Sequence, residues 1–160
     1  MTDTDGGLHA QAKADVFIQM FEAHYARVVR YAEGQLSGLA AAEDVASDVF
    51  RVAWLKLDPR EPFGLPWLIR TAMHKSRDVQ RSRYRGKAAV EALGERATST
   101  AGDHMSSLDR LSLLEALSKL SRRDRQILHL TYWVDLSAGE VAEVLRIRPG
   151  AVWTRLHRAR

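Results

Sequence analysis

The chain has 160 residues, 46% of them hydrophobic and 28% charged, which allows one domain or two small ones with a buried core. It contains no cysteine, so disulfides and Cys-based zinc sites are excluded, and no apolar run approaches the ~20 residues of a membrane span. Residues 1–7 are acidic and Gly-rich and lack the basic and apolar parts of a secretory signal. We therefore expect a cytoplasmic protein that does not insert into membranes.

The net charge of +4 hides an asymmetry along the sequence. Residues 1–50 contain eight Asp or Glu and three Lys or Arg, a balance of −5. Residues 70–87 contain seven Lys or Arg and one Asp, and residues 146–160 add five Arg, one His and no acid. Two separate cationic segments suggest two contacts with one polyanion.

Helical periodicity predicts three helices in the first half of the chain. The first covers residues 16–36, the second covers 42–57, and the third begins at Pro66 and ends near Arg85. Pro and Gly recur between residues 58 and 66, which therefore cannot form regular structure. The first helix carries a sustained apolar stripe, formed by Phe17, Met20, Phe21, Tyr25, Val28, Val29 and Ala32.

Two segments lack this periodicity. Residues 1–14 are expected to be disordered, and residues 86–107, rich in Ala, Gly, Ser and Thr, are expected to form a flexible linker in which 88–93 could make one helical turn. The sequence thus predicts an all-α protein with two small helical domains, residues 15–85 and 108–160.

The second half begins with an amphipathic stretch, 108–120, whose stripe is leucine. Ser121 and Asp124 are expected to cap the next helix, and Ser137 with Glu140 has the spacing of a capping box. Pro149 suits the first turn of a last helix.

The last two helices, joined by a tight turn at residues 146–149, predict a helix-turn-helix whose second helix can lie in a major groove. Val152, Leu156 and Ala159 should form the inner face of that second helix. An ordinary helical hairpin would show the same apolar pattern. However, five Arg without an acidic residue on so short an element favour DNA binding.

Residues 67–85 interleave aromatic and cationic side chains, a pattern typical both of single-stranded nucleic-acid binding and of ordinary solvated helices. Glu43, Asp44 and Asp48 form an acidic patch better suited to a partner or to solvent than to a metal, and the six His show no ligand spacing. No phosphate loop or nucleophile motif is present. We therefore expect no enzyme, metal, cofactor or small-molecule substrate.

In this order the pieces resemble an extracytoplasmic-function (ECF) sigma factor of the bacterial sigma-70 family, over about residues 15–85 and 108–160. The pieces that carry the resemblance are Ala42-Glu43-Asp44-Val45, Val49-Phe50, Trp54, Trp67-Leu68, Ala72, Asp78, Leu120-Ser121-Arg122-Arg123-Asp124-Arg125, Leu136-Ser137, Glu140-Val141-Ala142, Gly150-Ala151-Val152 and Arg155-Leu156-His157-Arg158-Ala159-Arg160.

The resemblance implies that the two domains are sigma regions 2 and 4, that the partners are core RNA polymerase and promoter DNA, and that an anti-sigma factor holds the protein inactive. It implies a core-polymerase surface formed by Asp44, Asp48, Phe50, Arg51 and Trp54. It implies binding of the −10 element by Phe63, Trp67, Arg70, His74, Lys75, Arg77 and Arg81. The −35 element would be bound by Arg148, Thr154, Arg155, His157, Arg158 and Arg160.

Several positions depart from the family pattern. His74 stands where the family usually has Asn, so the −10 base preference is expected to differ, and Trp153 stands where a cation is common. Arg146 replaces a frequent Gly at the end of the first helix of the helix-turn-helix. The sequence stops inside the second helix, so we expect a piece of a longer protein with weakened −35 binding.

Two other functions remain open at this point. A helix-turn-helix regulator would bind an operator, as a dimer, without polymerase. A helical adaptor would instead use the cationic faces to meet an acidic partner protein.

Overall fold

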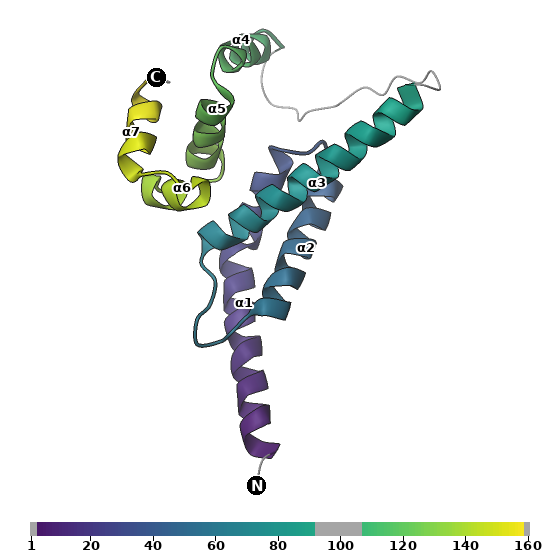
Figure 1. Ribbon diagram of the computed structural model, residues 1–160, viewed down its shortest axis with the longest axis vertical. Coiled ribbons are helices and arrows are strands. Elements are labelled where there is room, and N and C mark those ends of the chain that lie inside the picture. Colours follow the sequence, from purple (N-terminus) through teal and green to yellow (C-terminus); the bar gives the residue numbers. More distant parts are fainter. Residues whose placement is uncertain (1–2, 92–106, 159–160) are drawn as a thin grey trace.

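The computed structural model describes residues 3–91 and 107–158, and every regular element in these ranges is helical (Figure 1). The first half contains α1 (Asp3–Glu33), α2 (Leu39–Lys56) and α3 (Leu65–Glu91). The second half contains α4 (Ser107–Ser118), α5 (Arg122–Leu128), the π-helical turn η1 (His129–Trp133), α6 (Ala138–Leu145) and α7 (Pro149–Arg158). The predicted all-α class is confirmed.

The three helices of the first half pack on one another through the predicted stripes. Residues such as Val28, Val49 and Leu68 are fully buried between α1, α2 and α3. The segment between α2 and α3 is irregular, as its Pro and Gly residues predict, and only an isolated bridge between Asp58 and Glu61 interrupts it. Pro66 lies in the first turn of α3.

Two helices are longer than the sequence indicated. α1 begins at Asp3, although residues 1–14 were expected to be disordered; Gln11 Nε2 donates to Asp15 Oδ1 (2.9 Å) and Lys13 lies over the Trp54 ring, contacts that favour continued helix. α3 continues to Glu91, into the predicted linker, because one exposed Gly86 lowers helix propensity without ending a helix. The rest of that linker lies outside the described residues.

The helix-turn-helix forms as predicted, with both caps in place. Ser137 Oγ accepts from the Glu140 N–H (3.2 Å) and Glu140 Oε2 accepts from the Ser137 N–H (2.8 Å), a complete capping box. Ser121 Oγ likewise accepts from the Asp124 N–H at the start of α5. Val152 and Leu156 of α7 are buried, while Ala159 lies outside the described residues.

The leucine stripe of α4 behaves differently from its prediction. Of the stripe, Leu111 and Leu114 are exposed, whereas Leu117 and Leu120 are half-buried. Leu108 and Leu113 are exposed as well. Because the pattern is apolar nearly all round, no single face of α4 is selected for burial. In Figure 1, α4 therefore projects beyond the end of α5 instead of packing along it.

The two halves are in contact, which the sequence did not indicate. α6 packs on α3, and η1 packs on α1 (Figure 1). Buried residues of both halves, including Tyr31 and Met73 on one side and Ile127 and Leu130 on the other, belong to one continuous apolar cluster.

Candidate polymerase and nucleic-acid surfaces

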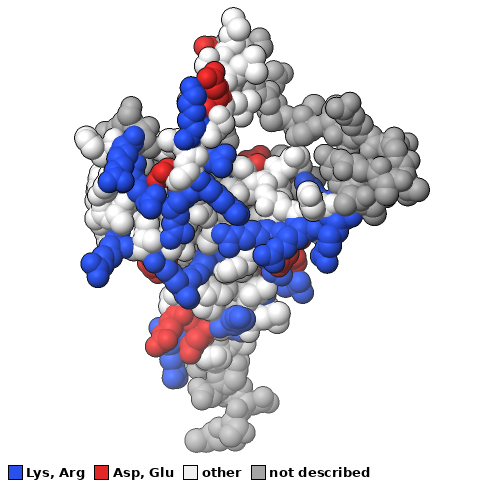
Figure 2. Space-filling model, turned by 45° about the horizontal axis from the view of Figure 1, so that its top comes forward, with Lys and Arg blue, Asp and Glu red and all other residues white. Residues whose placement is uncertain are grey.

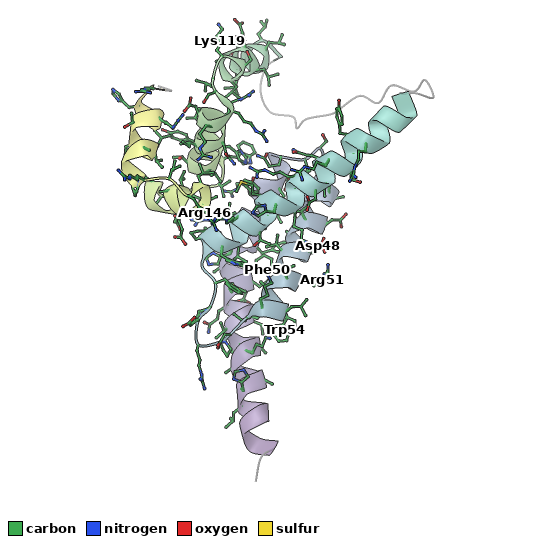
Figure 3. The ribbon with its side chains drawn as sticks, in the orientation of Figure 1. Asp48, Phe50, Arg51, Trp54, Lys119 and Arg146 are labelled. Atoms are coloured by element: carbon green, nitrogen blue, oxygen red, sulfur yellow. The ribbon has the colours of Figure 1, made fainter. Side chains whose placement is uncertain are left out.

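Most of the predicted core-polymerase residues form a stripe along the outer side of α2. Figure 3 shows Asp48, Arg51 and Trp54 following one another along this helix. Arg51 Nη2 donates to Asp48 Oδ1 (3.0 Å), and Trp54 is 39% exposed. Leu55, which the sequence analysis missed, lies four residues after Arg51 and is 69% exposed. The four-residue spacing from Arg51 places Leu55 on the same helical face, and this spacing is the feature of the sequence that identifies it.

Phe50 does not belong to this exposed stripe. It is only 2% exposed, and its ring meets those of Phe21 (4.9 Å) and Tyr25 (5.8 Å). Since a buried ring cannot reach a partner, the implied direct role of Phe50 in polymerase binding is replaced by a structural one. Phe50 holds α2 against α1 behind the exposed stripe.

The predicted −10 residues fall into two groups on α3. Trp67, Arg70, His74 and Lys75 share one helical face and line a groove of about 360 Å³. Phe63 stacks on Trp67 with ring centroids 3.9 Å apart and planes 13° apart. Arg77 instead lies near Tyr31, and Arg81 lines a separate hollow with Asp78 and Arg85, toward the end of α3.

The groove also contains residues that the sequence analysis did not select. Lys56 of α2 and Thr71 of α3 line it, and Arg146 enters it from the second half. Thr71 could have been found, because it lies four residues after Trp67 on the same helical face. Arg146 is distant in sequence and carries no local signal for this position. The groove thus holds four permanent cations, Lys56, Arg70, Lys75 and Arg146, and one acid, Asp78.

Lys75 links this groove to the polymerase stripe. Its Nζ lies 3.9 Å from Asp48 Oδ2, and Asp48 also accepts from Arg51. Both partners of the Lys75–Asp48 pair are partly exposed, so the pair contributes little to stability. It does place the predicted −10 surface directly beside the predicted polymerase surface.

The predicted −35 residues also fall into two groups. Arg148, Thr154, His157 and Arg158 are exposed, and Thr154 Oγ1 donates to the Gly150 carbonyl (2.9 Å). Arg155 instead binds a residue of α5, because its Nη1 donates to Asp124 Oδ1 at 2.8 Å. Arg160 lies outside the described residues.

Two neighbouring residues of α5 bind the two helices of the helix-turn-helix and hold them against α5. Asp124 binds Arg155 of α7, and Arg123 Nη2 donates to the Leu145 carbonyl at the end of α6 (3.3 Å). Hydrogen bonds from Ser121 and then Arg155 lower the pKa of the Asp124 carboxyl, which therefore remains ionised. Asp124 therefore binds α7 in addition to its predicted place in the cap of α5.

Figure 2 shows that Lys and Arg side chains spread in a band across one face of the molecule, with fewer acidic groups among them. Within the described residues, no three His, Cys, Asp or Glu are grouped so as to hold a metal ion. In the same ranges, no helix combines the length and apolarity needed to cross a bilayer. These surfaces are suited to binding a polyanion.

Known sigma factors are similar to this chain in sequence. The family model described as "Sigma-70, region 4" matches residues 110–160. The chain is 30% identical over 155 residues to the ECF RNA polymerase sigma factor SigL of Mycobacterium tuberculosis, covering 94% of this chain and 88% of that protein. It is 31% identical over 175 residues to the RNA polymerase sigma factor CnrH of Cupriavidus metallidurans, covering 99% and 91%.

Two solved structures are similar in fold. CnrH in complex with the cytosolic domain of CnrY matches with a TM-score of 0.60 and 28% identity, over 95% of this chain and 89% of that one. The sigma factor RpoE in complex with the anti-sigma factor NepR, from Bartonella quintana, matches with a TM-score of 0.62 and 23% identity, over 89% and 91%. With the sequence matches spanning nearly the whole chain, this protein belongs to the ECF RNA polymerase sigma factors.

Proposed function

We propose that this chain is a dissociable initiation subunit that binds core RNA polymerase and directs it to promoters by their −10 and −35 elements. The observation that carries the proposal is the presence of two cationic reading surfaces on two different halves. One is the groove of α3, and the other is the exposed face of α7. Residues 15–85 would act as region 2, and residues 108–160 as region 4.

The α3 groove has the chemistry of a site for unpaired DNA. Its cations can follow phosphates, and the Phe63–Trp67 stack offers an aromatic face to an unstacked base. Capture of unstacked bases would stabilise the melted promoter, so the protein would act by binding and would catalyse no bond chemistry. His74, exposed at the groove, would contact the strand where the family usually has Asn.

The α7 face has the chemistry of a duplex reader. Thr154, His157 and Arg158 are exposed on a helix whose opposite side is buried by Val152 and Leu156. An Arg can bind the O6 and N7 atoms of guanine in the major groove, which discriminates between base pairs. Arg148, just before the helix, would bind phosphate and set the register.

The stripe formed by Asp44, Asp48, Arg51, Trp54 and Leu55 would bind core polymerase. Because polymerase and chromosomal DNA are in the bacterial cytoplasm, the protein would act there. The structural neighbours were solved with CnrY and with the anti-sigma factor NepR. By this likeness we include an anti-sigma factor among the partners of this chain.

The test is run-off transcription with bacterial core polymerase, this protein and a pool of random promoter fragments. We expect selected templates to share two short motifs at a fixed spacing. Asp48→Lys should abolish transcription and core binding together, while Asp109→Lys, on exposed α4, serves as a charge-matched control. Absence of both core binding and transcription would refute the proposal.

A further inference from the structure

The first helix continues well past the end of α2 (Figure 1). Residues 7–12 of α1 are exposed throughout, and Lys13 is the first described side chain of this helix that is half-buried. Its Nζ lies over the indole of Trp54, 5.0 Å from the ring centroid. The start of α1 thus contacts the last turn of α2, at the end of the predicted polymerase stripe (Figure 3).

Two residues of α1 hold the Trp54 ring. Lys13 and Phe17 are four residues apart and therefore share one face of α1. The Phe17 ring lies 5.2 Å from the ring of Trp54, with the two planes 76° apart. Phe17 is itself held by buried Phe50, whose ring is 6.2 Å away. The aromatic cluster between α1 and α2 therefore ends in a cation, Lys13.

The helix that carries Trp54 gives its ring little support on the side of the helix end. α2 ends at Lys56, two residues after Trp54, so α2 has no residue one turn later that could pack on the indole. Trp54 also remains 39% exposed. The contacts from α1 therefore decide how the exposed part of the indole is oriented.

The Lys13 ammonium faces the indole and no carboxylate. Among the described side chains, Lys13 forms no ion pair, although its Nζ is placed over the Trp54 ring. The negative face of an indole attracts a cation more strongly than the faces of the other aromatic rings do. A lysine can also lay its apolar stem along a ring while its charged end stays in water. Such a contact fixes an exposed ring without burying it.

We propose that Lys13 is a positioning residue for polymerase binding, which holds the Trp54 indole in the orientation that core polymerase contacts. The inference rests on the proposed function, because that function places Trp54 on the polymerase surface. Trp is enriched among the residues that contribute most to protein interfaces. A ring that already has its bound orientation loses less freedom when the partner binds.

The size of the effect follows from the strength of the contact. The apparent affinity for polymerase is reduced by the fraction of molecules in which the indole has the wrong orientation. An exposed cation–π pair changes such an equilibrium by about two- to fivefold. Loss of the Lys13 cation should therefore weaken polymerase binding by about this factor.

The first experiment measures the dissociation constant for bacterial core polymerase by competition against the dye-labelled unaltered chain. Lys13→Gln should bind about two- to fivefold more weakly. Lys13→Arg should bind like the unaltered chain, because a guanidinium also binds over an indole. Lys119→Gln is the matched control, because Lys119 is exposed just after α4 and pairs with Glu115; its affinity should not change.

A double-mutant cycle separates positioning from direct contact. In a Trp54→Ala chain, Lys13→Gln should have no further effect on core affinity, because the ring that Lys13 positions is gone. An equal loss with and without Trp54 would show that Lys13 itself contacts polymerase, which would overturn the positioning role.

The orientation of Trp54 can also be followed in the free chain. Fluorotryptophan at the four Trp positions gives four fluorine NMR resonances, and Trp54→Phe assigns one of them to Trp54. Lys13→Gln should shift or broaden that resonance alone, and Lys13→Arg should leave it close to its original position. An unchanged Trp54 resonance in Lys13→Gln would overturn the inference.

The remaining outcomes distinguish this inference from the proposed function. Unchanged core affinity of Lys13→Gln, in a chain that binds polymerase and supports transcription, would overturn the inference and leave the proposed function intact. A loss of affinity that Lys13→Arg does not recover would overturn it as well, because the charge would not be the cause. Absent core binding by the unaltered chain would refute the proposed function, and the inference with it.

Discussion

The two cationic helices, α3 and α7, use similar side chains in different surroundings. The groove face of α3 is partly covered, since Arg146 enters it from the other half. The face of α7 that is predicted to bind DNA is open, and even Trp153 on it is 64% exposed. The α3 groove is therefore lined by residues of both halves, whereas the exposed face of α7 belongs to a single helix. The variants below test this difference, beginning with the one that should change DNA binding most.

Trp67→Ala should give the largest effect, and only on single-stranded DNA. Loss of an aromatic platform costs about 1–3 kcal/mol for each stacked base. Anisotropy with a −10 oligonucleotide should therefore show roughly tenfold or greater loss, with −35 duplex binding intact. Trp153→Ala is the matched control on α7. Equal weakening of strand and duplex by Trp67→Ala would contradict the separation of the two surfaces.

Arg158→Ala should lower discrimination at one −35 base pair by about 1–3 kcal/mol if its guanidinium binds guanine at two atoms. Competition between duplexes that differ at single positions would locate that base pair. A loss that is the same for all sequences would instead identify Arg158 as a phosphate contact.

Arg148 and Arg155 should differ in how they affect the salt dependence of duplex binding. Arg148→Gln should reduce the slope of log K against log salt by about 0.9, the value for one phosphate contact on B-DNA. Arg155→Gln should lower affinity with an unchanged slope, because its guanidinium is bound by Asp124. Asp124→Asn should behave like Arg155→Gln. A changed slope for Arg155→Gln would show that Arg155 leaves Asp124 to bind DNA.

Arg146→Gly and Arg146→Ala both remove the cation from the groove, but only glycine relieves the left-handed turn. A non-glycine residue in this conformation costs about 1–2 kcal/mol. Urea unfolding should therefore show Arg146→Gly to be about 1 kcal/mol more stable than Arg146→Ala. Equal stabilities would mean that the turn relaxes out of this conformation when Arg is absent.

The smallest effect should be a pH dependence of the contact between the two halves. Burial lowers the pKa of His129 below 6.5, against a hydrogen bond with the Tyr31 backbone, and burial followed by Arg27 lowers the pKa of His24, against Glu140. The packed arrangement of the two halves therefore disfavours the two imidazolium forms. Its stability is complete above pH 6.5 and falls as the pH drops below that value, because the separated halves take up more protons.

The charges around these rings do not reverse this sign. Burial raises the pKa of Tyr31, which faces His129 from α1, to about 12, against the lowering effect of Arg77 of α3, so Tyr31 stays neutral. Two dyes, one on Ser47→Cys and one on Glu143→Cys at exposed positions of the two halves, would report this contact by energy transfer. The transfer should decrease on acidification from about pH 8 to about pH 5.5, across the range in which His titrates. In His129→Leu, which keeps an apolar side chain, the decrease should be smaller. An identical decrease in that variant would assign the effect to other groups.

Local rules predicted much of the fold. Ser137 and Glu140 specify a cap within four residues, and Pro149 specifies a helix start, so the helix-turn-helix follows from the sequence alone. The face shared by Trp67, Arg70 and His74 follows from helical spacing alone. These features depend only on residues close together in sequence.

Contacts between distant residues could not be derived in this way. Nothing local marks Gly34 as the partner of His129, or Arg146 as part of the α3 groove. Phe50 was assigned to the polymerase surface by likeness to a family, whereas packing against α1 buries it. The leucines of α4 show the same limit, because apolar spacing does not provide a surface to pack against.

The π-helical turn η1 has a consequence for how such proteins can diverge. The Val134 N–H donates to the His129 carbonyl (3.1 Å), five residues back, so this turn accommodates one residue more than an α-turn. Each residue of an α-helix rotates the chain by about 100°. Deleting one codon here would shorten η1 by one residue and rotate the residues after it by about 100°, while α5, α6 and α7 would keep their lengths. Insertion or deletion of one residue at this turn would therefore change the orientation of the helix that is predicted to bind duplex DNA.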